Sequence, residues 1–166
     1  MTAIAFDLDA PLGHRRVIIR RDGDGVEMVE LPWGLNPSPP GGRPFALVRS
    51  ERHFPSHRCL IPASEFRFGR AKHRYTVSLR SQDWFYLAGI WRPASEGWPE
   101  AFAILTVEAN ADIAPYQERQ MAVLRREHRM HWLDLRPEHD LLRPLPAGSF
   151  AVSLLGEKAR QAALAI

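Results

Sequence analysis

Cysteine is almost missing from this chain, in which Cys59 is the only one. A single cysteine excludes an internal disulfide, and no spacing of cysteine and histidine matches a structural zinc site. We therefore expect a reduced, cytoplasmic setting and neither a metal nor another cofactor. Cys59 is the one candidate for a thiol nucleophile, but it lies in an apolar segment without a histidine placed beside it by motif, and buried apolar cysteines are inert.

Long apolar runs are lacking as well, because no stretch of the sequence approaches the roughly 18 apolar residues of a membrane-spanning helix. The first residues also lack the basic segment followed by an apolar one that marks a secretory signal. We expect neither export nor contact with a membrane.

Lysine is scarce, so arginine supplies most of the positive charge. The formal net charge is +3 and the sequence pI is about 9.5. The planar guanidinium of arginine suits contacts to phosphates and bases. An ordinary arginine-rich surface would have the same composition, and both interpretations stay open at this point.

Strand patterns dominate the chain, whose 166 residues and 45% hydrophobic content suit one domain over residues 1–166. Asp and Gly at 22–25 predict a hairpin turn between strands at 17–21 and 26–31. The apolar segments 84–90 and 101–107 predict central strands, and the apolar run at 58–66 predicts a buried strand that stops at Pro62. We expect an α+β fold with a mainly antiparallel, curled or barrel-like sheet flanked by a few helices.

The helical patterns lie near the C-terminus. Residues 124–135 place Leu124, His128, Trp132 and Leu135 on one stripe at helical spacing, and Pro137 ends the segment. His128 and His131 are spaced to share a metal, but the sequence offers no third ligand, so we interpret them as a solvated helix face. We expect a closing strand within 141–153 and an alanine-rich helix at 156–166.

Asp7 and Asp9 in the segment IAFDLDAPLG are spaced like the nucleophile and general acid of a haloacid-dehalogenase phosphatase. However, Ala10 and Pro11 follow where that family has a small residue and Thr or Val. No later acidic pair after a strand is positioned to hold Mg²⁺. We therefore reject this interpretation.

Several short blocks follow one another at characteristic distances. They are WGL at 33–35, VRSE at 48–51, RCLIPASEF at 58–66, LAGIW at 87–91, ILTVEAN at 104–110, ERQMAVL at 118–124 and WL at 132–133. In this order and spacing the blocks resemble the SOS-response-associated peptidase (SRAP) family, over about residues 10–155. The resemblance implies an SRAP-like fold, a DNA-damage context and capture of abasic sites in single-stranded DNA as a covalent adduct.

The positions that carry this chemistry in the family hold other residues here. Leu47 stands where the family has an asparagine that contacts the reacting sugar, Phe68 where it has the acid/base glutamate, and Gln117 where it has a histidine. A phenyl ring moves no proton, and glutamine keeps only a hydrogen bond. The chain begins nine residues before Ala10, where the family has about thirty residues and a cysteine after the initiator Met, whereas Thr2 stands here.

The family's DNA-contacting positions are better retained. By resemblance, Arg49 and Arg119 would contact phosphates, with Glu51 kept beside Arg49. Thr106 matches a family threonine near the phosphates, although a β-branched strand residue explains it equally well. Trp33 either stacks on DNA or belongs to the core. Pro39 takes the place of an aromatic that in the family follows a Pro-Ser pair and stacks on a base.

We therefore expect a catalytically inactive SRAP-like protein, with no catalytic residue, that binds single-stranded or abasic-site DNA noncovalently. Two alternatives stay open. One is an active abasic-site cross-linker or peptidase, which would need a nucleophile that the sequence does not reveal, or a start further upstream that restores a cysteine. The other is an interaction module without affinity for DNA, whose protein partners the sequence does not identify.

Overall fold

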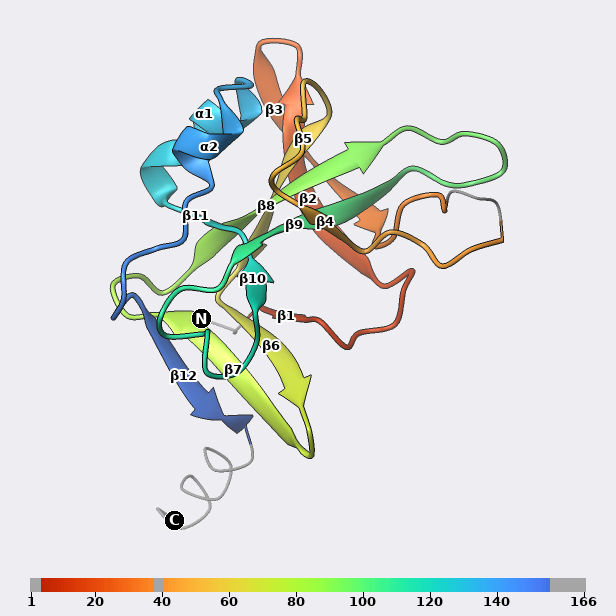
Figure 1. Cartoon of the computed structure of the whole chain (residues 1–166). Coiled ribbons are helices and arrows are strands. Elements are labelled where there is room, and N and C mark those ends of the chain that lie inside the picture. The colour runs from red at the N-terminus through yellow and green to blue at the C-terminus, as the bar shows by residue number, and fades with distance from the viewer. Residues whose placement is uncertain (1–3, 38–40, 156–166) are drawn as a thin grey trace, which may run out of the picture.

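Two mostly antiparallel sheets make up the computed structural model, which describes residues 4–37 and 41–155 (Figure 1). The smaller sheet has the strand order β1-β6-β7-β12, and the larger has the order β10-β9-β8-β5-β2-β3, with β11 paired to β8 and β4 paired to β9. The strands are β1 (Ala5–Asp7), β2 (Arg15–Asp22), β3 (Gly25–Pro32), β4 (Leu47–Arg49), β5 (Arg58–Ala63), β6 (Glu65–Arg70), β7 (His73–Leu79), β8 (Phe85–Arg92), β9 (Ala101–Glu108), β10 (Arg119–Met121), β11 (Val123–Leu124) and β12 (Phe150–Leu154). Three short helices follow, namely η1 (Arg126–His128), α1 (Arg129–Leu133) and α2 (Glu138–Leu141).

The expected fold class is confirmed: the chain is rich in mainly antiparallel sheet, with short helices beside it. In the described part of the chain the sheets stay open and do not close into a barrel. The predicted hairpin is also present, because β2 pairs with β3 from Arg15 opposite Pro32 to Asp22 opposite Gly25. Gly23 in the turn has a φ of 59°, a conformation that glycine adopts without strain.

The central strands β5, β8 and β9 are buried on both faces, which explains their continuous apolar sequences. Side chains such as Ile61 and Phe102 face a core between the two sheets. Their neighbours, such as Leu60 and Leu105, face a second core under the helices. Gly89 sits where a Cβ would lie 2.5 Å from Ile61 Cδ1 and 2.8 Å from the Ala103 carbonyl oxygen, so the strands approach this closely only with glycine there.

The end of β5 differs from the sequence prediction. The strand expected to stop at Pro62 continues to Ala63, because Pro62 pairs with Tyr86 of β8 on one side while β2 reaches only Cys59 and Leu60 on the other. Proline is tolerated there because no second neighbour needs its missing N–H.

The predicted helix over 124–135 is shorter than expected. Leu124 pairs with Tyr86 in β11, so strand pairing overrides the helical pattern at that end. At the other end Leu135 has a φ of 62° and is 47% exposed, and therefore leaves the apolar stripe. The closing strand begins only at Phe150, since α2 ends at Leu141 and residues 142–149 form no strand. The alanine-rich helix predicted at 156–166 lies outside the described residues.

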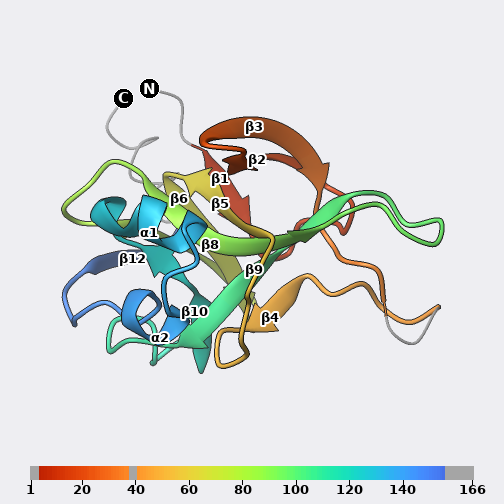
Figure 2. The same cartoon turned by 90° about the horizontal axis from the view of Figure 1, so that it is seen from above.

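Arg58 fastens the helices to the large sheet. Its buried guanidinium donates to the carbonyl oxygens of Phe54, Trp132 and Arg136, and it forms an ion pair of 2.8 Å with Glu138. The same guanidinium lies 4.1 Å from the centre of the Trp132 ring. Figure 2 shows α1 beside β5, and α1 also contacts α2. One side chain thus joins β5, both helices and the loop that carries Phe54.

The described residues include no helix that is both long and apolar enough to cross a membrane.

Candidate functional site

Four of the predicted DNA-contacting residues meet where β4, β9 and β10 lie side by side. Arg119 Nε donates to Thr106 Oγ1 over 3.0 Å, and its two terminal nitrogens reach the two carboxylate oxygens of Glu51 at 3.1 and 3.0 Å. A further bond of 2.7 Å runs to the Thr106 carbonyl oxygen. Arg49 lies directly opposite Thr106 in the parallel pairing of β4 with β9.

The charges of this cluster partly cancel. The hydrogen bond from Arg119 is the largest influence on Glu51 and holds the pKa of that carboxyl below its usual value, while partial burial opposes the shift and the charges of Arg119 and Arg49 add to it. Four N–H groups of Arg119 are already directed at protein acceptors. Arg119 therefore positions Glu51 and β4, whereas Arg49 keeps its guanidinium free of any ion pair with a described residue.

Trp33 lies apart from this cluster, and its predicted role in stacking on DNA needs a correction. It is only 3% exposed, its ring packs edge-on against Phe6 at 5.1 Å, and its Nε1 donates to the Ala46 carbonyl oxygen. Both faces of the ring are covered because the strand end that carries it runs into the core between the sheets. Of the two roles left open by the sequence, the structure supports the core role, and we do not carry Trp33 forward as a stacking residue.

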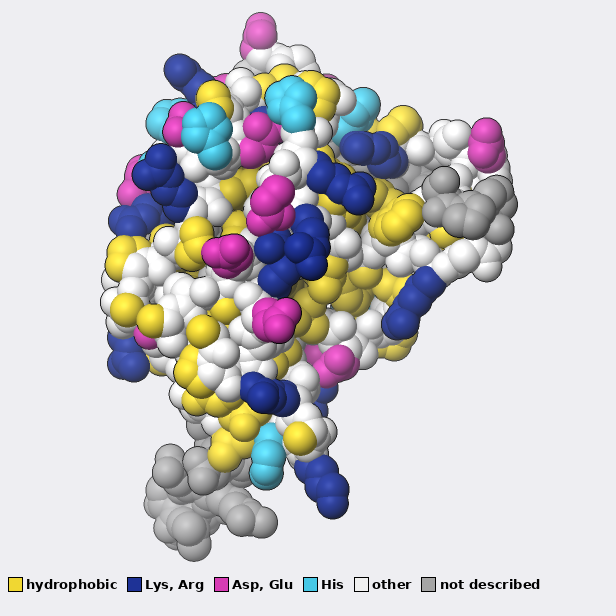
Figure 3. Space-filling model, viewed as in Figure 1, with side chains coloured by type: hydrophobic (Ala, Val, Ile, Leu, Met, Phe, Trp, Pro, Cys, Tyr) yellow, Lys and Arg dark blue, Asp and Glu magenta, His cyan; other side chains and the backbone are white. Residues whose placement is uncertain are grey.

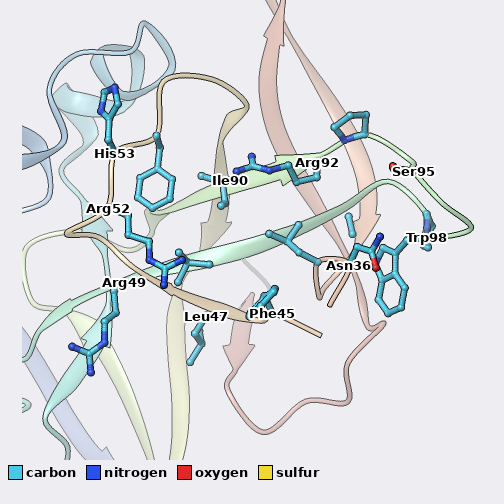
Figure 4. Close-up of a pocket in the computed structure, with 16 residues that line it drawn as sticks. Asn36, Phe45, Leu47, Arg49, Arg52, His53, Ile90, Arg92, Ser95 and Trp98 are labelled. Carbon is cyan, nitrogen blue, oxygen red and sulfur yellow. The ribbon is translucent and has the colours of Figure 1, made fainter. Parts of the chain in front are cut away.

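A large pocket opens beside the cluster, with a volume of about 870 Å³ (Figure 4). Its floor includes Leu35, Ile90 and Ala101, which belong to the core on the helix-bearing face of the large sheet. The helices cover one end of this face, and the pocket is the end that they leave open. Phe45 and Leu47 stand at its edge with 44% and 43% of their surface exposed.

Residues 33–35 and 46–49 lie along β9 and form one side of the pocket. Gly34 donates its N–H to the Phe102 carbonyl oxygen, and the Ala46 carbonyl oxygen accepts from Ile104. Leu35 and Phe45 exchange two backbone hydrogen bonds, which hold Phe45 beside Leu35 at the pocket. Gly34 has a φ of 121° and lies where a Cβ would come 3.2 Å from Pro44 Cβ, so the turn depends on glycine.

Positive charge borders the pocket. Arg49, Arg52 and Arg92 line it, none of the described lining residues is acidic, and none of the three arginines forms an ion pair with a described carboxylate. His57, next to this rim, has a pKa below its ordinary value, first because it is partly buried and then because Arg92 and Arg20 repel a proton. Figure 3 shows an apolar area on this face with dark-blue basic side chains beside it, and the basic residues that line the pocket include Arg49, Arg52 and Arg92.

The three positions that depart from the SRAP pattern hold side chains without acid–base chemistry. Leu47 is an exposed aliphatic side chain at the pocket edge. Phe68 is 2% exposed, and its ring stacks on Tyr75 at 5.5 Å and meets Tyr116 at 6.2 Å. Gln117 buries its Nε2, which finds no hydrogen-bond partner among the described residues.

Cys59 is fully buried on β5, and burial raises the pKa of its thiol far above the usual value. The thiolate is the reactive form of cysteine, so this site does not supply a nucleophile. Asp7 and Asp9 both form ion pairs with Arg74. His128 and His131 stack at 5.9 Å, and within residues 4–37 and 41–155 no group of three or more potential ligands could hold a metal ion.

Sequence reasoning missed Phe45, Arg52 and Arg92. Residue 39, where the sequence suggested that an aromatic contact is lost, lies outside the described residues, but Phe45, six positions later in the sequence, presents an aromatic ring at the pocket. The available signal was an aromatic residue in a polar, proline-rich segment. Exposure of such a ring to water is unfavourable unless a ligand or another part of the protein covers it. Arg52 and Arg92 had no such signal, because only the folded chain brings them to one rim.

Comparisons with known proteins bear on the family and the fold of the chain. Residues 49–156, more than half of the chain, match the sequence profile of the family described as SOS response associated peptidase (SRAP). A solved structure of a protein from Bacteroides thetaiotaomicron is 21% identical with a TM-score of 0.67, over 86% of this chain and 74% of that one. A protein from Bordetella bronchiseptica is 19% identical with a TM-score of 0.70, over 92% of this chain and 91% of that one. These two likenesses show the fold alone. No curated protein matches the chain.

Proposed function

The chain belongs to the SOS response associated peptidase (SRAP) family, and on that basis we propose that it is a catalytically inactive member that binds single-stranded DNA noncovalently. The observation that carries the proposal is the arginine rim, where Arg49, Arg52 and Arg92 border a pocket without an acidic lining residue among those described. A cytoplasmic, DNA-damage setting is part of the same proposal.

Phosphates are the ligand that this rim suits best. A guanidinium that is not paired with a carboxylate can form charge-assisted, bidentate hydrogen bonds to a phosphate without displacing a protein partner. Arg119 would need to give up Glu51 first, so in this proposal it acts by holding β4, which carries Arg49, against β9. Glu51 acts in the same way, as the partner of Arg119.

Inactivity rests on what replaces the family's reacting groups. A leucine, a buried phenylalanine and a glutamine stand at Leu47, Phe68 and Gln117, and none of these side chains takes up or delivers a proton near neutral pH. The only thiol lies in the core at Cys59. Binding without bond formation is the activity that this set of residues supports.

Fluorescence anisotropy with a labelled single-stranded oligonucleotide, titrated at several salt concentrations, tests the proposal. Release of counterions makes log K fall with log salt at a slope of roughly 0.7 per phosphate contact on single strands, so three contacts predict a slope of about −2. Arg49→Gln, Arg52→Gln and Arg92→Gln should each flatten it by about 0.7. Arg15→Gln is the matched control, because Arg15 is exposed on β2 and paired with Glu30.

A denaturing gel of the same mixtures, with a true abasic site in the strand, separates binding from chemistry. We expect no adduct that survives denaturation. A gel-stable adduct would show that the protein retains the covalent reaction, and absence of binding even at low salt would refute the DNA interaction altogether.

A further inference from the structure

The lining of the pocket is mostly apolar inside its charged rim. Leu35, Phe54, Ile90 and Ala101 form the buried part, and Phe45 and Leu47 extend it to the surface. Contact of such large apolar side chains with water is unfavourable. Covering them with a flat apolar group lowers the free energy. The pocket therefore fits a ligand that is anionic at its border and flat and apolar inside.

Resting on the proposed function, we infer that this pocket takes unpaired bases of the bound strand, so that the protein prefers base-bearing single strands over strands with abasic positions. A single strand alternates phosphates, which match the arginine rim, with bases, which match the interior. Stacking of a base on an aromatic side chain is tolerant of sequence because every base has a π face. Phe45 is the side chain exposed for such stacking.

An abasic position lacks the group that this interior suits. Its sugar offers hydroxyl groups, and Leu47 at the pocket edge neither donates nor accepts a hydrogen bond. Placing the bare sugar there would leave the sugar's polar groups unpaired and the Phe45 ring uncovered. The same residue that removes the family's contact to the reacting sugar thus adds apolar surface for a base.

The volume of the pocket agrees with a ligand of this size. About 870 Å³ lies toward the upper end of the range for small-molecule sites, so more than one stacked base has room. Asn36 and Ser95 at the far end, drawn in Figure 4, are polar side chains that can hydrogen-bond to the edge of a base. Trp98 lies beside them with its Nε1 already bonded to the Gly34 carbonyl oxygen, so it contributes a ring and not a free donor.

Competition anisotropy with three labelled strands of equal length tests this inference. One is oligo-dT, one carries a central block of three reduced abasic residues, and one is reduced abasic at every position except its ends. Because stacking contributes about 1–3 kcal/mol per base, the loss of even one stacked base from the central block should weaken binding by about 5- to 160-fold. Since the phosphates are unchanged, the salt slope should stay the same.

Phe45→Ala should abolish most of this preference while leaving the affinity for the abasic strand nearly unchanged. The variant keeps the backbone bonds between residues 35 and 45 and removes a side chain that is 44% exposed, so the fold should persist. Met28→Ala is the matched control, because Met28 is a 67% exposed apolar residue on β3 that does not line the pocket.

The outcomes are separable. Binding of all three strands with equal affinity, tighter binding of either abasic strand than of oligo-dT, or a preference for oligo-dT that survives Phe45→Ala would each overturn the inference while leaving the proposed function intact. Absence of binding to every strand would instead overturn the proposed function, and this inference with it. A dimer in sedimentation that Phe45→Ala dissociates would assign the pocket to a second copy of the chain and also overturn the inference.

Discussion

Replacing Arg58 by methionine should destabilise the fold more than any surface arginine does. The change keeps an apolar stem against Trp132 but leaves the carbonyl oxygens of Phe54, Trp132 and Arg136 without this donor. It also leaves the Glu138 carboxylate, whose side chain is 13% exposed, without its guanidinium partner. Removing one member of a buried ion pair costs about 3–5 kcal/mol, which is a large part of the roughly 5–15 kcal/mol that stabilises a domain.

Urea unfolding followed by tryptophan fluorescence measures this loss. With an m-value near 2 kcal/mol/M, the midpoint should fall by about 2 M without a change in m. Arg15→Met is the control, since Arg15 and Glu30 form an ion pair with 56% and 58% of their side chains exposed, and exposed pairs contribute about 0–1 kcal/mol.

Glu138→Gln gives a second, independent check. Glutamine can still accept the N–H of Phe54 but carries no charge. In the Arg58→Met background it should therefore cost less than it does alone, because it removes a charge that has lost its partner. The reasoning is wrong if Arg58→Met costs no more than Arg15→Met, or if the two changes at 58 and 138 are additive.

Two further predictions follow from single residues. Burial alone would raise the pKa of Asp112, but hydrogen bonds from the N–H groups of Gly148 and Phe150 and from Asn110 outweigh it and hold the pKa below the ordinary value. The unfolded chain therefore binds the proton more tightly than the folded one. The stabilisation is present above roughly pH 4 and is lost as pH falls through the lowered pKa. Asp112→Asn should therefore reduce the acid dependence of the unfolding midpoint. Cys59 should resist iodoacetamide in the folded protein and react in urea, as mass spectrometry of the labelled chain would record; rapid labelling without denaturant would contradict its burial.

The strands could be predicted from the sequence because their signals are local. Asp22 to Gly25 marks a hairpin turn, and apolar residues on both faces of β8 and β9 mark central strands. The helix predicted from Leu124 failed at its first turn, since a periodic pattern does not reveal that Leu124 has a strand partner at Tyr86. Pairing with a distant segment overrides local preference there.

The site could be predicted only in part. Arg49, Glu51, Thr106 and Arg119 came from resemblance to family blocks, and the fold places them together, although their roles stay predictions. The pocket could not be foreseen, because it forms where the loop around Phe45 meets the strand end at Arg92 across the large sheet. The burial of Trp33 could not be predicted either, since the sequence pattern around a tryptophan at a strand end is the same whether its side chain faces solvent or the core.

The parallel pairing of β4 with β9 has a consequence for how the protein folds and fluctuates. β4 is three residues long, and Leu47 pairs with Ile104 only after most of the sheet has been synthesised. Such a contact closes a long loop of chain. The conformational entropy of that loop is lost before the pairing contributes any stabilisation. β4 should therefore dock late in folding, onto strands that are already assembled, and its amides should exchange with solvent through local opening rather than global unfolding. The face that carries Arg49 and Leu47 is then the last surface to form and the first to open.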